Sequence, residues 1–489
     1  MDFDFTFGPR TSPRRNEGEP WRMLILSDLQ GAATEAAEPT RERRMVRVDI
    51  DNIDDVLARY APSIVLGAEA GGERLQFRSF DDFHPDTLVR TLSVFRGLRD
   101  LRTRLEHPAT FAGAVAELRA ETIGGASVTP EDAPVPPTED GRSTFERLLG
   151  RSPADQPTVS QAAPHAAVLG SVDALIRRIV APHIVQAADP QLPQLLSAVD
   201  IALSDTMRRV LHDPAFQEVE AAWRGIRWLV SSLELGEELE LHLLHISRAQ
   251  LSKGAAPESD LFRRLVDRDA RTMGGLQFSA LIGNYRFDAT PEDLDVLESM
   301  GSLASALGAP FVAEGGASLA GSSGLAEQPD PRDWRPVAPE VEAEWAALRN
   351  GSVASYLGLV LPRFLLRLPY GGRTDPIEAF RFEEQPAKPD HESFLWGNPA
   401  FACAAVMART SEGDSVPAEA ADITGLPAFV SIMDDESRLQ PGAEVYLTER
   451  AVGAVLERGL MPLVSLRDRD AARLIRLQSI ANPPTPLGG

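Results

Sequence analysis

Two histidines, His242 and His245, stand three residues apart in the apolar segment LHLLHIS, and they are the first side chains that could hold a metal ion. A strand directs alternate side chains to opposite faces, so this spacing turns the two rings away from each other. No acidic or thiol group lies near them at metal-ligand spacing. The sequence therefore predicts no metal site at these histidines.

Glycine-rich segments, which can cradle phosphate groups, occur at Gly315–Gly316 and at Gly321–Gly324. Neither continues into the Lys-Ser or Lys-Thr pair of a P-loop, and neither follows a strand at the spacing of a dinucleotide-binding turn. They are predicted to be loop glycines. No serine lies in the Gly-x-Ser-x-Gly turn of a hydrolase.

The one cysteine, Cys403, lies in the alanine-rich segment FACAA, which predicts a buried helix and a structural thiol rather than a nucleophile. A single cysteine also excludes an intrachain disulfide and a cysteine-based zinc or iron–sulfur site. These residue types together predict no catalytic group, no cofactor and no metal. We therefore expect a protein that is not an enzyme.

The charge of the chain narrows the class of partner. Its 489 residues include 72 acidic and 49 basic ones, which gives a net charge of −23. Such a protein repels nucleic acid and anionic membranes unless it concentrates basic charge locally, and no basic block occurs. The N-terminus lacks a signal-peptide pattern, and no apolar run approaches the about twenty residues that span a bilayer. We expect a cytoplasmic protein that binds no nucleic acid and inserts into no membrane.

An α/β or α+β framework is predicted for both main parts of the chain, because helical patterns alternate with short apolar strands. Residues 21–120 form the first domain, with strands predicted at 23–28, 45–49, 63–66 and 75–77, and helices at 53–60 and 87–105. Residues 166–489 form the second, with helices predicted at 192–211, from Pro214 onward, and at 291–307. Its predicted strands lie at 239–247, 277–285, 311–312, 357–361 and 463–465.

Two segments flank or join these domains. Residues 1–20 form an N-terminal arm, either without fixed structure or ordered against a neighbour. The alternation of Phe3, Phe5 and Phe7 suits a strand added to another sheet. Residues 121–165 form a proline-rich linker. Within it, 143–149 predicts a short amphipathic helix with a capping box, and its apolar residues are Phe145, Leu148 and Leu149. So short a helix needs a partner or the body of the protein to be stable.

Large aromatic and arginine side chains lie in segments that contain no candidate catalytic residue. They are Trp223, Arg363, Arg367, Tyr370 and Trp396. Two interpretations remain open: these residues are core anchors at strand ends and turns, or they are interface anchors of a large assembly, where Arg and Trp are enriched.

Several motifs of the chain resemble the contractile-sheath proteins of the type VI secretion system. The segments LILSD, DNIDDVL and LQFRSFDDFHP resemble the small sheath subunit. The segments HDPAFQ, WRG, GNY, LPRFLLRLPYG, FRFEE and LWGN resemble the large subunit. The resemblance implies two sheath-type α/β parts that pack as an intramolecular pseudo-heterodimer, with the large-subunit-like part lacking the family's C-terminal tail.

The resemblance also implies partners and a role. Family sheaths polymerise helically around an inner tube, meet a baseplate and are disassembled by an AAA+ ATPase. Phe3, Phe5 and Phe7 would then form an inter-subunit strand, and the helix with Phe145, Leu148 and Leu149 would be the ATPase-recognition helix. The expected function is a structural component of a type VI secretion sheath, as protomer or as cap or baseplate-joining accessory. The alternative is a non-polymerising adaptor that binds sheath, baseplate or ATPase.

Overall fold

A computed structural model describes residues 19–31, 40–115, 192–254, 259–270, 275–385, 391–410, 421–433, 436–467 and 469–487. Residues 1–18 of the predicted arm at 1–20 and the predicted linker helix at 143–149 lie outside the described residues. The chain divides into two units: residues 1–97 with 200–489, and residues 98–199. Everything below on the sheet and its surroundings concerns the first unit.

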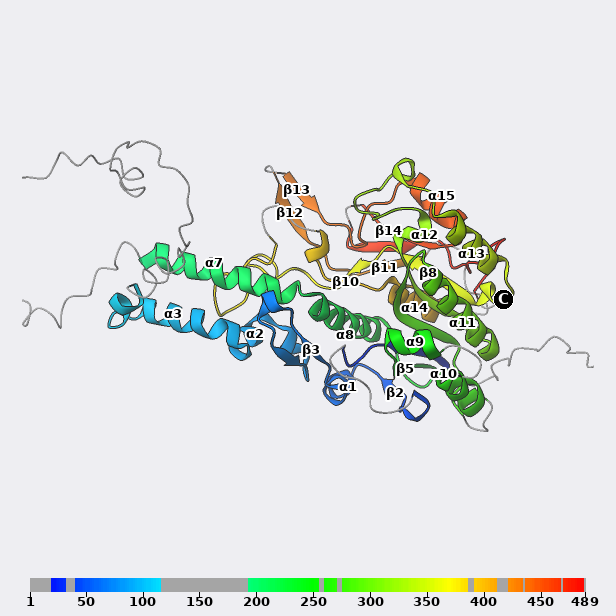
Figure 1. The fold of residues 1–489 in the computed structure, drawn as a ribbon, viewed down its shortest axis with the longest axis horizontal. Coiled ribbons are helices and arrows are strands. Elements are labelled where there is room, and N and C mark those ends of the chain that lie inside the picture. Colours follow the sequence, from blue (N-terminus) through cyan, green and yellow to red (C-terminus); the bar gives the residue numbers. More distant parts are fainter. Residues whose placement is uncertain are drawn as a thin grey trace, which may run out of the picture. The chain divides into compact units, whose positions relative to one another are not determined.

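The described residues form one nine-stranded sheet with the order β11-β15-β14-β8-β7-β6-β1-β5-β2 (Figure 1). The strands are β1 (Trp21–Ser27), β2 (Val46–Val48), β5 (Leu239–His245), β6 (Ala280–Phe287), β7 (Phe311–Gly315), β8 (Leu357–Leu361), β11 (Ala421–Thr424), β14 (Met461–Ser465) and β15 (Ala471–Leu474). From β14 to β5 all neighbours are parallel, while β2, β15 and β11 pair antiparallel. This mixed sheet confirms the predicted α/β class.

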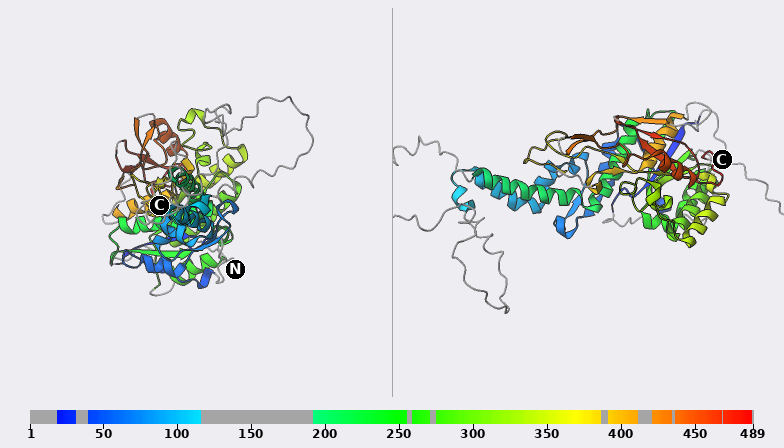
Figure 2. Two further views of the ribbon diagram at one scale, coloured as in Figure 1. Left: turned by 90° about the vertical axis from the view of Figure 1, so that its left-hand side faces the viewer. Right: turned by 90° about the horizontal axis from the view of Figure 1, so that it is seen from above.

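Strand β1 joins the two ends of the chain into one sheet. It pairs on one side with β5, in the register Trp21↔Leu239 to Ser27↔His245, and on the other side with β6, from Met23↔Ala280 to Leu26↔Gly283. Its central residues, Met23–Leu26, are completely buried because a central parallel strand is covered on both faces. Strands from residues 21–48 and from residues 239–474 therefore share one hydrogen-bonded sheet, of which Figure 2 gives two further views.

Within the ranges that the structure describes, three two-stranded pairs accompany this sheet: β3 (Ser63–Val65) with β4 (Arg74–Gln76), β9 (Phe364–Leu365) with β10 (Trp396–Gly397), and β12 (Val430–Met433) with β13 (Glu436–Leu439). The helices are α1 (Ile53–Tyr60), α2 (Pro85–Thr91), α3 (Arg96–Glu106), α7 (Leu192–Leu211), α8 (Pro214–Ser232), α9 (Arg248–Gly254), α10 (Asp260–Phe262), α11 (Pro291–Leu307), α12 (Ala317–Ala320), α13 (Pro339–Asn350), α14 (Pro399–Thr410) and α15 (Glu449–Glu457). Residues 263–270 continue α10 as a π-helix.

Helices α11 and α14 both cover strands β6, β7 and β8. Helix α11 packs with α13, and α14 packs with α8. Side chains of the sheet alternate, and one set, including Leu24, Leu281 and Phe311, belongs to the same apolar cluster as Leu297 of α11. Local signals set the bounds of α11: Thr290 caps its N-terminus, Pro291 starts it and Gly308, at φ 69°, ends it.

One helix prediction was wrong. The stripe at 87–105 predicted a single helix, but the chain forms α2, a 3-10 turn at Ser93–Phe95 and α3. Leu92 is extended, at φ −77° and ψ 135°, and the N–H of Ser93 donates to Glu73 Oε2 at 2.7 Å. The apolar spacing continues across the break because Leu92, at the break, and Phe95, after it, are both buried. The spacing therefore could not reveal that the helix is interrupted.

Candidate functional site

Arg367 lies at the centre of a buried ion-pair network. Its guanidinium donates from Nε to Glu220 Oε1 at 2.9 Å and from Nη1 to Glu384 Oε2 at 2.7 Å. The side chains of Glu220 and Glu384 are 0% and 1% exposed, and that of Arg367 is 9% exposed. Burial alone would raise the pKa of Glu384, but Arg367 and His212 outweigh it and lower that pKa to about 2. The Glu384 carboxylate therefore stays ionised, and both carboxylates are ion-paired with Arg367.

Tyr370 belongs to the same network. Its N–H donates to Glu384 Oε2 at 2.7 Å, and its hydroxyl accepts from Arg224 Nη2 at 3.2 Å. The Arg367 guanidinium also lies over its ring, 4.5 Å from the ring centre. Burial raises the pKa of Tyr370 to about 12. The network thus links α8, which carries Glu220 and Arg224, to the segment that follows β9.

Arg363 and Trp396 meet at a second polar cluster. Arg363 Nε donates to Glu444 Oε1 at 3.0 Å and its Nη2 lies 3.2 Å from Glu392 Oε1. His391 Nε2 lies 3.0 Å from Glu444 Oε1, and Trp396 stacks on the His391 ring at 5.0 Å. Burial opposes the ionisation of Glu444, yet His391 and Arg363 lower its pKa to about 2. Three potential metal ligands, His391, Glu392 and Glu444, gather here, but both carboxylates are already paired with the Arg363 guanidinium.

Trp223 is completely buried on α8. Its Nε1–H donates to the carbonyl oxygen of Leu29, just after β1, at 3.3 Å, and its ring lies 5.8 Å from that of Tyr60. A side chain of the large-subunit-like part therefore contacts the segment that resembles the small subunit.

The five predicted anchors thus fall in three places, and each contacts its own chain. Arg367 contacts Tyr370, Arg363 bonds to Glu444 beside the His391–Trp396 pair, and Trp223 bonds to Leu29 after β1. Their role in an assembly stays a prediction. Phe3, Phe5, Phe7, Phe145, Leu148 and Leu149 lie outside the described residues. Cys403 is buried in α14 as predicted, and burial raises the pKa of its thiol.

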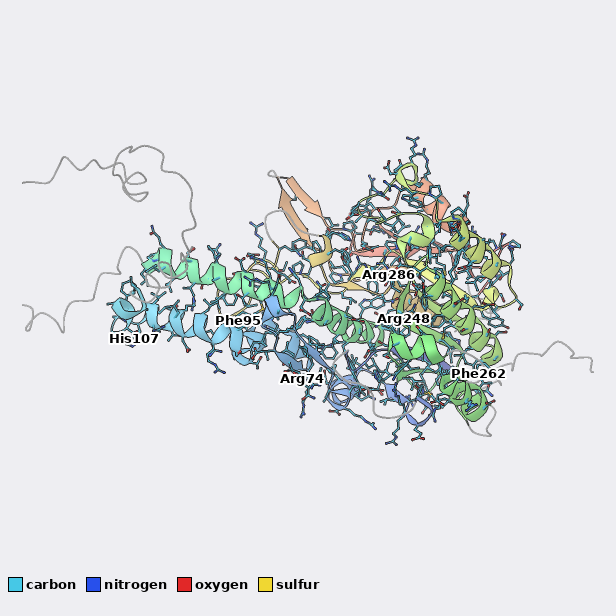
Figure 3. The ribbon with its side chains drawn as sticks, in the orientation of Figure 1. Arg74, Phe95, His107, Arg248, Phe262 and Arg286 are labelled. Carbon is cyan, nitrogen blue, oxygen red and sulfur yellow. The ribbon has the colours of Figure 1, made fainter. Side chains whose placement is uncertain are left out.

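A cleft of about 740 Å³ opens at the carboxyl ends of β1, β5, β6 and β7. Its charged lining includes Asp28, Glu218, His245, Arg248, Arg286, Glu314 and Arg363. Figure 3 labels Arg248, from α9, and Arg286, from β6. His245 is held in the cleft wall, where its Nδ1 accepts from the N–H of Leu29 at 3.0 Å and burial lowers its pKa.

Sequence reasoning missed this cleft. Its charged residues are scattered along the sequence between Asp28 and Arg363, and each looks like an ordinary surface residue beside its own strand. One signal was present: Asp28, Ser247, Arg286 and Glu314 lie at or just beyond the C-terminal ends of apolar runs. Such ends meet at one edge of a parallel sheet. Among the described residues, no helix is both long and apolar enough to cross a membrane.

Two family models match the chain. Residues 193–481 match the model described as VipB: EvpB/VC_A0108, tail sheath N-terminal domain. Residues 5–122 match the model described as T6SS_VipA: Type VI secretion system, VipA, VC_A0107 or Hcp2. The chain thus carries a VipA-like part followed by a VipB-like part in one polypeptide.

Two proteins of Pseudomonas aeruginosa are similar to these parts. The type VI secretion system sheath protein TssC1 is 31% identical over 308 residues, which cover 60% of this chain and 62% of that protein. The type VI secretion system sheath protein TssB1 is 27% identical over 99 residues, which cover 19% of this chain and 58% of that protein. The chain therefore spans about three fifths of the length of these relatives.

Proposed function

The chain belongs to the VipB tail-sheath family, and from that membership we propose that it is a structural component of a type VI secretion contractile sheath. It acts as a sheath protomer, or as an accessory that caps a sheath or joins it to a baseplate. In this role the protein works through assembly and not as an enzyme, and it works in the cytoplasm.

The observation that carries this proposal is the position of β1. The VipA-like part supplies β1, and the VipB-like part supplies both neighbours, β5 and β6. A strand with partners on both sides is an integral part of the sheet. We infer that the two parts pair within one chain as a pseudo-heterodimer, the unit from which an assembly of sheath type would be built.

The proposed partners are other copies of this chain or other sheath subunits, and beyond them the inner tube, a baseplate and an AAA+ disassembly ATPase. The alternating Phe3, Phe5 and Phe7 support an arm that adds a strand to a neighbour. The apolar residues Phe145, Leu148 and Leu149 support a short helix that binds the ATPase. Arg363, Arg367, Tyr370, Trp223 and Trp396 hold the protomer rigid for this role.

Negative-stain electron microscopy of the purified protein, with mass photometry, tests the proposal over a series of protein and salt concentrations. We expect tubes or stacked rings, and more of them as salt rises, because salt screens the repulsion between copies of net charge −23. A variant in which Phe3, Phe5 and Phe7 are replaced by serine tests the arm, with the unchanged protein as its control. This triple variant should keep the protomer mass and lose the assemblies.

Monodisperse particles of one or two chains at every condition would overturn the protomer proposal. In that case the adaptor alternative predicts co-purification with sheath, baseplate or ATPase proteins.

A further inference from the structure

The VipA-like part makes a second contact with the VipB-like part, through residues outside the shared sheet. The segment from β3 to α2 contributes one side, and the start of α8 with residues 378–379 contributes the other. Between them the Phe83 ring lies 5.9 Å from the ring of Phe216, with the two planes at 78°. Both side chains are completely buried. Apolar burial is not directional, so this ring pair stabilises the contact without selecting one partner.

Asp213 adds a directional bond to the contact. It precedes α8, and its Oδ1 accepts from the N–H groups of Ala215 and Phe216 at 3.0 and 3.3 Å, which caps the helix. Its other oxygen, Oδ2, accepts from the N–H of Gly67 at 2.7 Å. Asp213 is only 8% exposed. One buried carboxylate therefore caps a helix of the VipB-like part and holds the backbone of the VipA-like part.

The close approach of Asp213, and not the backbone conformation, requires glycine at position 67. The φ of −58° and ψ of 158° at Gly67 are open to any residue. A Cβ at this position would lie 3.1 Å from Asp213 Oδ2, which is closer than ordinary van der Waals contact. Any side chain here would therefore push the carboxylate away from the backbone N–H that it accepts from.

Asp86 makes the reciprocal contact from the VipA-like part. It lies in the first turn of α2, and its Oδ1 accepts from the N–H groups of Glu378 and Ala379 at 3.1 and 2.9 Å. Its Oδ2 lies 3.0 Å from the same Glu378 nitrogen. Each part thus presents a carboxylate to backbone donors of the other part. Hydrogen bonds to an ionised acceptor are about twice as strong as neutral ones.

We propose that Asp213 and Asp86 are the specificity-determining residues for the pairing of the two parts. The bonds of β1 in the sheet are main-chain bonds, which every residue except proline can make. The surface formed by Asp213, Phe216 and the N–H groups of 378–379 instead fits a VipA-like partner with glycine at position 67 and a carboxylate at position 86. This selectivity rests on the proposed pairing within one chain, and it adds which side chains make that pairing selective.

Release of the VipA-like part from the cut chain tests the proposal. A protease site between residues 123 and 161 is cleaved after folding, the protein is immobilised through a C-terminal tag, and biolayer interferometry follows the loss of mass in buffer. Asp213→Asn should speed release about ten-fold, because the one oxygen of asparagine can serve the α8 cap or Gly67 but not both. Asp86→Ala removes its bonds to 378–379 and should speed release by about ten-fold or more.

Variants on the other side of the bond make the test specific. Gly67→Ala leaves Asp213 in place and should also speed release about ten-fold, whereas a capping role alone would leave this variant without effect. Combining it with Asp213→Asn should add little, because both changes break one bond. The controls are Gly97→Ala, whose Cβ would meet nothing within 4 Å, and Asp81→Ala, at an exposed position. Both should release the VipA-like part at the unchanged rate.

An unchanged release rate in Asp213→Asn, or effects of Asp213→Asn and Gly67→Ala that multiply in the double variant, would overturn the proposal even if Asp86→Ala failed to fold. Release is read on single protomers, and assembly is read separately by microscopy. Faster release in a chain that forms no tubes would therefore keep this inference and count against the protomer role. Tubes from a chain whose variants all release at the unchanged rate would do the reverse.

Discussion

Glu314 makes the free energy of unfolding depend on pH, because a buried carboxyl favours its neutral form. Its pKa is about 7 in the folded chain, against an ordinary value of 4.5 for a glutamate side chain. Its contribution is therefore fully present at pH values below about 4.5 and is lost as the pH rises through 7. Glu314→Gln should raise the free energy of unfolding at pH 8 by up to about 3 kcal/mol and change it little at pH 4.5. Urea unfolding at pH 8 and pH 4.5 measures this difference in free energy. Glu298→Gln, at an exposed position of α11, is the control and should show no pH-dependent gain.

Replacing Arg367 should lower the free energy of unfolding, whereas replacing Glu314 should raise it at pH 8. Replacing Arg367 by methionine keeps most of the side-chain volume but leaves the buried Glu384 without its arginine and Glu220 with Arg224 alone. We expect a loss of about 3–5 kcal/mol in the free energy of unfolding. The same substitution at Arg332, which is exposed, should cost less than about 0.5 kcal/mol. Equal effects of the two substitutions in urea unfolding would show that the network does not stabilise the fold.

At the residue scale, sequence reasoning found Arg367 and Tyr370 but not what they contact. The Glu220 partner lies 147 residues away along the chain, and only folding brings it within 2.9 Å. The same holds for Glu314, whose burial depends on β6 and β8 lying on either side of β7. Residue type indicates which side chains need a partner, while the partner itself is a property of the tertiary structure.

At the scale of elements, the close packing of α8 and α14 gives a sharp prediction. A Cβ added at Gly225 of α8 would lie 2.5 Å from Cε2 of the buried Phe401 ring. A Cβ at Gly453 of α15 would meet nothing within 4 Å. Gly225→Ala should therefore lower stability by about 1–3 kcal/mol, and Gly453→Ala should raise it by about 0.5–1 kcal/mol. Thermal unfolding of both variants checks this, and a stabilising Gly225→Ala would contradict the packing of these helices.

Elements with local signals at both ends were predicted well. Helix α11 has the predicted bounds because Thr290, Pro291 and Gly308 mark its ends. Helix α7 also has the bounds predicted from its periodicity. The strands near the C-terminus were predicted poorly. The last expected strand, at 463–465, is followed by β15 (Ala471–Leu474), which is short and partners β14 and β11. Such a strand depends on its neighbours more than on its own residues.

At the scale of the whole molecule, one sheet unites segments that the linker joins. An engineered protease site placed between residues 123 and 161 would cut the chain between the VipA-like and VipB-like matches. We expect the two fragments to co-elute in size-exclusion chromatography, because β1 is hydrogen-bonded between β5 and β6. They should separate only in denaturant. Fragments that separate in native buffer would contradict pairing within the shared sheet, and the uncut protein is the control for elution volume.

The central place of β1 has a consequence for biosynthesis. β1 ends at Ser27, whereas β5 begins at Leu239 and β6 at Ala280. At about 5–20 residues per second, a ribosome needs roughly 10 to 40 s to deliver β5 after β1 has been made. During that interval the apolar Met23–Leu26 has neither of its sheet neighbours. We therefore expect the nascent N-terminal part to be a substrate for chaperones that cover exposed apolar segments until translation has passed β6.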